Sequence, residues 1–269
     1  VRMALNRLHL VVGFCLSTLG WTILQLVVTP VISRNYFPVY YKKLIDAASG
    51  DPTKKEVRKA KKALMEWDTR APGFFHAVLS GILSIYCCLI DETLRKDTLR
   101  ATSFAWLLTV SVASGFFFWD LCVCILKFEI YGFEYVLHAA FCLITYLICG
   151  YVENYPMAWH AASFLMFELS TPLMHIRWAL IEFKGDTRII TFCTYVFALL
   201  FFLCRIVWGN LYAFPLVWLE LVNKPADMPN WQAGVFWLNS VVSALLNTFW
   251  MYKIILTGMR KHDKKEKAQ

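Results

Sequence analysis

The chain has 269 residues, of which 58% are hydrophobic and 17% charged, and its mean hydropathy is +0.51. Because a soluble domain averages about 45–50% apolar and about 25% charged residues, this composition excludes an ordinary soluble domain and indicates a polytopic, all-α membrane protein. The formal net charge of +8 comes largely from basic clusters beside apolar stretches, so it reports membrane topology and gives no reason to expect a nucleic-acid partner.

Seven stretches of the sequence are long and apolar enough to cross a bilayer, which takes about 20 residues. The predicted spans cover residues 8–28, 73–90, 101–126, 133–152, 157–182, 189–208 and 232–256. Apolar sequence continues through 209–222, which leaves open a bent helix end, a re-entrant segment or an eighth span. Whether Val1 is the true N-terminus also stays open.

The first apolar stretch resembles a signal peptide in one respect, since Arg2 and Arg7 precede it. It is longer than an h-region of about 7–15 residues, and no A-x-A cleavage site follows it. We therefore expect a retained transmembrane helix.

Basic residues predict the orientation, because Lys and Arg concentrate in the cytosolic loops of membrane proteins. Ten of them lie between residues 33 and 72, and five follow Leu256. If both segments are cytosolic, an even number of spans separates them, which fits six spans after the first and argues against an eighth. The predicted organisation is a first transmembrane helix (1–32), a basic cytosolic loop (33–66), a six-helix membrane domain (67–256) and a basic cytosolic tail (257–269).

The basic loop also carries an apolar pattern. Val57, Ala60, Leu64 and Trp67 recur at helical spacing among lysines. A short amphipathic helix on the cytosolic leaflet, attracted to anionic lipid, has this pattern. A solvated loop is the alternative that the sequence leaves open.

Several predicted spans carry ionisable side chains, each of which costs roughly 2.5–3.5 kcal/mol at the bilayer centre on insertion scales. At a rise of about 1.5 Å per residue, Glu168 lies near the midplane of the membrane. By the same measure, one layer in the cytosolic half contains His76, Asp120, His138 and His175. Pro172 lacks a backbone donor, so it predicts a break that frees the carbonyl of Glu168, with Ser170 or Thr171 available to satisfy it. The candidate lining of a polar, lipid-binding cavity is His76, Asp120, His138, Glu168, His175, Arg205 and Asn247.

The sequence contains no pattern typical of a metal or cofactor site. Its nine cysteines lie in apolar stretches without a C-x-x-C pair, where Cys behaves as a small hydrophobe. The patterns G-x-x-x-x-G-K, H-E-x-x-H and G-x-S-x-G are absent. We therefore expect no metal and no cofactor.

Six segments, taken in order, resemble the TLC domain family, which includes ceramide synthases and translocation-associated membrane proteins. They are EWDTRAPGFFHA (66–77), SGFFFWD (114–120), EYVLHAAF (134–141), FELSTPLMHIRW (167–178), FFLCRIVWG (201–209) and LNTFWMYKI (246–254). The fourth is the most specific and is similar to the TLC-domain-containing subgroup. The resemblance implies a six-helix, cup- or barrel-like bundle that holds a lipid in the endoplasmic reticulum.

Two functional hypotheses follow from this resemblance. The first is a protein that binds or handles membrane lipid, a phospholipid or sphingolipid, and acts in lipid homeostasis. The alternative is an acyl-CoA-dependent N-acyltransferase resembling ceramide synthase, with His138 as base and Asp120 or Glu168 orienting it. Ceramide synthases carry paired histidines and a His-Asp segment, whereas Ala139 follows His138 here and residues 167–171 contain no His-Asp. These departures favour the first hypothesis over the enzyme.

The C-terminal tail carries a candidate address signal. The chain ends KKEKAQ, which places Lys265 and Lys267 at the fifth and third positions from the carboxyl end. This spacing resembles the dilysine retrieval signal that coat proteins read on cytosolic tails. We expect a multi-pass protein of the endoplasmic-reticulum membrane with a cytosolic C-terminus; the plainer interpretation of the lysines is a basic membrane anchor.

Overall fold

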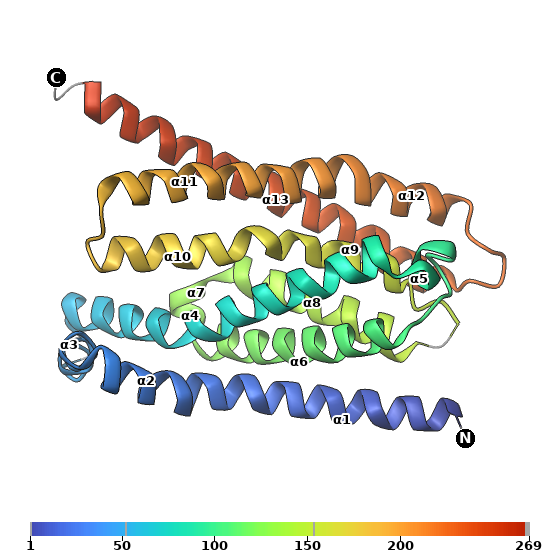
Figure 1. Ribbon diagram of the computed structural model, residues 1–269, viewed down its shortest axis with the longest axis horizontal. Helices are drawn as coiled ribbons and strands as arrows, with labels where there is room; N and C mark the ends of the chain where they lie inside the picture. The colour runs from blue at the N-terminus through green and yellow to red at the C-terminus, as the bar shows by residue number, and fades with distance from the viewer. Residues whose placement is uncertain (1, 52, 153, 267–269) are drawn as a thin grey trace. The chain divides into compact units, whose positions relative to one another are not determined.

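The computed structural model describes residues 2–51, 53–152 and 154–266, with side chains from Leu8 to Thr257 apart from the two gaps. Every regular element assigned within these residues is a helix (Figure 1), so the prediction of an all-α, polytopic membrane protein is confirmed. Lys267 lies outside the described residues, and Lys265 lies near the end of the last helix.

The first nine elements, in chain order, are α1 (Arg2–Ile23), the π-helical η1 (Leu24–Val28), α2 (Thr29–Tyr36), α3 (Pro38–Ala48), α4 (Lys55–Ile85), the π-helical η2 (Tyr86–Ile90), α5 (Glu92–Lys96), α6 (Phe104–Leu126) and α7 (Phe128–Tyr131). The remaining eight are α8 (Phe133–Tyr151), α9 (Ala158–Leu165), the 3₁₀-helical η3 (Met166–Ser170), α10 (Thr171–Glu182), α11 (Thr187–Phe201), the π-helical η4 (Phe202–Ala213), α12 (Phe214–Val222) and α13 (Asn230–Glu266).

Six helices in the described part of the chain are long and apolar enough to span a bilayer. They cover Leu8–Tyr36, Lys55–Ile90, Phe104–Leu126, Phe133–Tyr151, Thr187–Val222 and Asn230–Thr257. The remaining predicted span, 157–182, is also helical from Ala158 onward, but η3 divides it into shorter pieces. The count of seven spans therefore stays a prediction.

The segment 209–222 is a direct continuation of the preceding helix. Residues Thr187–Val222 form one helical run, in which η4 joins α11 to α12. Pro215 lies inside this run, in the first turn of α12, where it cannot donate a backbone hydrogen bond to the preceding turn. Of the alternatives left open by the sequence, the structure adopts the helical continuation.

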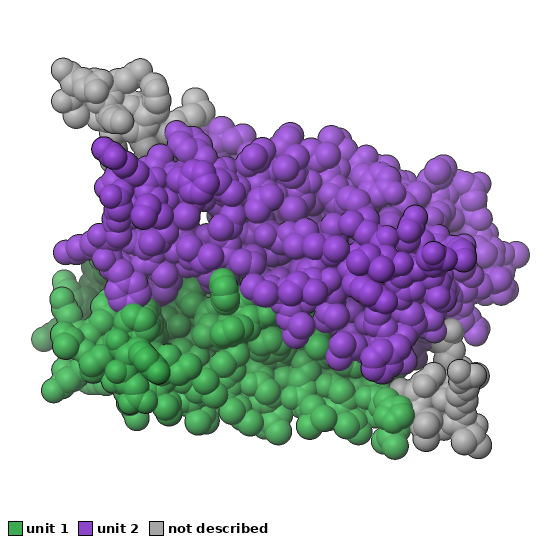
Figure 2. All heavy atoms as spheres, in the orientation of Figure 1, with its two compact units in different colours: residues 1–76, 110–144 green, residues 77–109, 145–269 purple. Residues whose placement is uncertain are grey.

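The chain divides into two compact units, coloured separately in Figure 2. Unit 1 consists of residues 1–76 and 110–144, and unit 2 of residues 77–109 and 145–269.

Unit 1 is built on close contact between α1 and α6. An added Cβ at Gly13 would lie 2.6 Å from Ser111 Oγ, and one at Gly115 would lie 2.5 Å from Ser17 Cβ. Such small residues let two membrane helices approach closely. The resulting van der Waals packing stabilises their association in lipid, where the hydrophobic effect contributes little. Beside this crossing, Trp119 donates through Nε1 to Gln25 Oε1 at 3.0 Å, which satisfies two buried polar groups.

The basic segment before the second span is largely helical. The structure contains α3 and the first turns of α4 there, so the amphipathic helix predicted around Val57 forms as part of α4. Trp67 Nε1 donates to Ser33 Oγ at 2.8 Å, and Tyr41 donates to Asp68 Oδ1 at 3.1 Å. Burial, followed by the neighbouring Asp68 carboxylate, raises the pKa of Tyr41 to about 12, so this phenol stays a donor.

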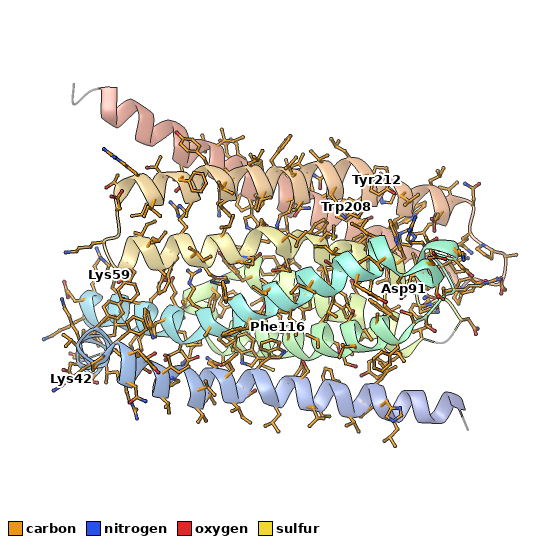
Figure 3. All side chains as sticks on the ribbon, viewed as in Figure 1. Lys42, Lys59, Asp91, Phe116, Trp208 and Tyr212 are labelled. Carbon is orange, nitrogen blue, oxygen red and sulfur yellow. The ribbon has the colours of Figure 1, made fainter. Side chains whose placement is uncertain are left out.

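Unit 2 gathers its helices around η3 and η4. Gly209 lies against the ring of Phe167, to which an added Cβ would come within 2.7 Å. Trp208, labelled in Figure 3, donates through Nε1 to the carbonyl of Ser163 at 2.9 Å. These contacts fix η4 against the α9–η3 segment. They therefore position the polar side chains of Glu168 on η3 and Arg205 on η4.

Candidate functional site

The most deeply buried cation that the structure describes in unit 2 is Arg205 of η4, whose side chain is only 8% exposed. Its Nη2 lies 3.7 Å from Glu168 Oε1, and its Nη1 lies 3.4 Å from Asn247 Oδ1. The aromatic rings of Phe167, Phe201 and Trp250 lie 5.1–5.7 Å from the guanidinium carbon. Cation–π attraction of this kind stabilises a desolvated guanidinium.

Asn247 connects α13 to η4 through both ends of its amide. Besides accepting from Arg205, it donates through Nδ2 to the backbone carbonyl of Arg205 and to Asn210 Oδ1, both at 3.2 Å. Asn210 in turn donates to Thr248 Oγ1 at 3.2 Å. The structure therefore brings Glu168, Arg205 and Asn247, three of the sequence candidates, into one polar cluster.

The predicted break before Pro172 is present as the 3₁₀ segment η3. Pro172 occupies the first turn of α10, and the N–H of Thr171 donates to the carbonyl of Glu168. The tighter 3₁₀ bond thus replaces the one that Pro172 cannot make. His175 lies farther along α10 and is partly buried.

In unit 1, the candidates lie around the aromatic side chains of α6. His76 is 1% exposed and stacks on Phe116 with centroids 3.5 Å apart; Phe116 is labelled in Figure 3. The ring of Phe117 lies 5.3 Å from His76 and 6.3 Å from His138. Asp120 lies one turn further along α6, within 3.8 Å of Cys124 Sγ. His76, Asp120 and His138 therefore belong to unit 1, while the other four candidates belong to unit 2.

Unit 2 contains a second, partly buried pair that the sequence analysis did not single out. His160 Nε2 lies 2.8 Å from Glu220 Oε2, and Thr98 Oγ1 donates to the same oxygen at 2.8 Å. The three residues come from α9, α12 and the loop after α5. The sequence did contain a signal for this pair. Both His160 and Glu220 are ionisable residues within apolar stretches, and an ionisable residue in a membrane segment is by default a candidate functional residue.

A third polar cluster joins three loops of unit 2. The Arg100 guanidinium donates to Tyr155 Oη at 2.6 Å and lies 3.3 Å from Asp227 Oδ1, while the Tyr155 hydroxyl donates to Asp227. Gln232 Nε2 donates to the Tyr155 carbonyl. The hydrogen bond from Tyr155, and then the Arg100 charge, lower the pKa of Asp227 from its ordinary value.

This lowered pKa predicts how stability depends on pH. A carboxyl with a depressed pKa in the folded state contributes stability above its unfolded pKa, about 3.9, and loses it as pH falls through the folded pKa. The melting temperature of Asp227→Asn should therefore lie below that of the wild type by a constant margin above about pH 5. This difference in melting temperature should shrink as pH falls below about 4. When Asp227→Asn is introduced into Tyr155→Phe, the difference that it causes should be smaller throughout. A margin that does not change with pH would contradict this assignment.

Metal and cofactor binding find no support in the described residues. Within them, no group of three or more His, Cys, Asp or Glu side chains could hold a metal ion. All nine cysteines are free thiols, and most are buried. We assign no cofactor, and that expectation stays a prediction.

Comparison with known proteins identifies a family and several relatives of this chain. A family model described as the TLC domain matches residues 66–256. TLC domain-containing protein 4-B of Danio rerio is 26% identical over 98% of this chain and 97% of its own length. TLC domain-containing protein 4 of Homo sapiens is 25% identical over 77% of this chain and 80% of its own.

A yeast relative matches over a shorter region. Topoisomerase I damage affected protein 4 of Saccharomyces cerevisiae is 29% identical over 54% of this chain, and the match spans about half, 53%, of the yeast protein. Since the family model covers most of the chain, this multi-pass membrane protein belongs to the TLC domain family.

Proposed function

We propose that this protein binds a membrane lipid within its TLC domain and acts in lipid homeostasis. The observation that carries the proposal is the Arg205–Glu168–Asn247 cluster inside apolar helical segments. A buried ion pair often stabilises a protein no more than apolar residues of similar size, so its presence is better accounted for by a ligand than by stability.

The geometry of the pair supports a zwitterionic headgroup as ligand. The distance of 3.7 Å between Arg205 Nη2 and Glu168 Oε1 exceeds the 2.7–2.9 Å of a charge-assisted hydrogen bond. A phosphate can bind the guanidinium and an ammonium can bind the carboxylate, a complementarity that phospholipids and phosphosphingolipids share. The TLC resemblance implies a lipid as ligand and does not specify its headgroup.

Acyl transfer receives less support from the residues of unit 1. The ceramide-synthase pattern needs a second histidine beside His138, at the position of Ala139. The Ala139 side chain is fully buried, so a larger side chain there would overpack its surroundings. Acyl-CoA is therefore a partner only of the alternative hypothesis.

Lipid binding can be tested by extracting lipids from the purified full-length protein and identifying them by mass spectrometry. We expect one zwitterionic lipid class to be enriched about tenfold over the surrounding membrane, which corresponds to about 1.4 kcal/mol of selectivity. Glu168→Gln should abolish the enrichment, and Glu129→Gln, at an exposed position of α7, should retain it. A lipid profile identical to that of the membrane would contradict the proposal.

We also propose residence in the endoplasmic reticulum with a cytosolic tail. The support is the dilysine spacing of Lys265 and Lys267 and the basic charge of the preceding segment. Changing both lysines to Ser should let the protein escape to later compartments, observed by microscopy. Unchanged residence would reduce the lysines to an anchor, and a tail protected from protease in sealed microsomes would overturn the orientation.

A further inference from the structure

The His160–Glu220 pair of unit 2 contains a buried polar atom without a partner. His160 is fully buried, and its Nδ1 has no hydrogen-bond partner among the described residues. Its Nε2 faces Glu220 Oε2 at 2.8 Å. A half-turn of the ring would place Cε1 on the carboxylate, so the present orientation is the favourable one.

The pair dictates the tautomer of the histidine. An ionised Glu220 can only accept hydrogen bonds, so Nε2 must carry a proton and donate it to the carboxylate. In the neutral ring, Nδ1 is then an acceptor. Leaving such a group buried and unsatisfied is unfavourable, so an unmatched acceptor at this position indicates a missing donor.

Glu220 is held in place and stays accessible. Thr98 donates to Oε2, the same oxygen that faces the histidine. The Glu220 side chain is 23% exposed, whereas that of His160 is 0% exposed. The pair is therefore exposed only on its Glu220 side, along α12.

We propose that His160 and Glu220 form a binding site for the hydroxyl group of a membrane lipid, with His160 Nδ1 as the hydrogen-bond acceptor. A hydroxyl brings one donor to the single free acceptor, whereas an ammonium brings three and would leave the others unmatched. The chemistry fits the free alcohol of a glycerolipid or of a sphingoid base. This inference rests on the lipid-binding function proposed above but concerns a different cluster from that of Arg205.

The test uses the full-length protein in nanodiscs and photoactivatable lipids with a diazirine near the head. One pair of probes is a diacylglycerol with a free hydroxyl and its O-methyl ether; the second pair is a ceramide and its O-methylated form. The wild type should cross-link at least one hydroxyl probe about 5- to 10-fold more than its ether, as one hydrogen bond of about 1–1.4 kcal/mol predicts. The adducts should map to 158–165 or 214–222.

His160→Gln retains a donor for Glu220 but replaces the ring acceptor Nδ1 by an amide oxygen on the same carbon as that donor, so no acceptor occupies the position of Nδ1 and the preference for the hydroxyl should fall to about one. His9→Gln, at an exposed position of α1, is the matched control and should leave the preference unchanged. The comparison of probes on the wild type does not depend on how the variant folds. Equal labelling by hydroxyl and ether, or a preference that survives His160→Gln, would overturn the hydroxyl site while leaving lipid binding intact. Labelling by neither pair above an unrelated membrane protein would also overturn the hydroxyl site, while the proposed function is decided separately by the lipids extracted from the wild type and from Glu168→Gln.

Discussion

Arg205→Met is expected to destabilise the protein by about 3–5 kcal/mol, because it leaves the Glu168 carboxylate buried without its cation. It also removes the guanidinium from its contacts with the rings of Phe201 and Trp250 and leaves Asn247 Oδ1 without that donor. In thermal melting of the detergent-solubilised protein, the loss corresponds to a decrease on the order of 10 °C.

Glu168→Gln should cost less than Arg205→Met. The amide still offers an oxygen to the guanidinium, and Arg205 retains Asn247 and its aromatic neighbours. The double variant Arg205→Met/Glu168→Gln should be more stable than the sum of the single effects predicts, since neither charge is then left unpaired. Strictly additive effects would show that the two side chains do not interact.

Glu168→Gln also separates a structural role from a ligand-binding role. If the carboxylate serves mainly to pair with Arg205, the variant should express poorly. If it serves a lipid, expression should persist while the enriched lipid is lost. A variant with normal expression and a normal lipid profile would exclude both roles.

The sequence predicted the helical class and most of the spans because long apolar runs have few alternatives in a bilayer. It also placed the break before Pro172, since a missing donor has a local consequence that does not depend on the fold. The cluster of Glu168, Arg205 and Asn247 could be predicted only as a set of polar residues. Which of them touch depends on packing between helices far apart in the sequence, which no single-chain pattern contains.

His160 and Glu220 illustrate the limit of placing polar residues by their depth along the predicted spans. Glu220 lies in the segment 209–222, whose structure the sequence left open, so it had no assigned face or depth. The continuous run from α11 through η4 to α12 places it within reach of α9. The π-helical turns of η4 contain more residues per turn than an α-helix. They therefore change which face of the helix Glu220 occupies, and a pattern with a period of 3.6 residues does not predict this change.

Gly115→Leu is expected to separate α1 from α6 within unit 1. A Cβ at this position would lie 2.5 Å from Ser17 Cβ and 2.9 Å from the carbonyl oxygen of Phe14. The backbone atom cannot rotate away, so α1 itself must move. Two hydrogen bonds across the crossing would be strained or lost, from Ser17 Oγ to the Val112 carbonyl and from Thr18 Oγ1 to the Gly115 carbonyl. Overpacking of this kind typically costs about 1–3 kcal/mol, and the lost hydrogen bonds add to it.

Gly20→Leu provides the matched control on α1, because an added Cβ there has no other atom within 4 Å. It should be neutral or stabilising by up to about 1 kcal/mol, since Leu favours a helix more than Gly does. Thermal melting gives the difference in stability. Equal melting temperatures for the two variants would mean that α1 does not pack on α6 through these small residues.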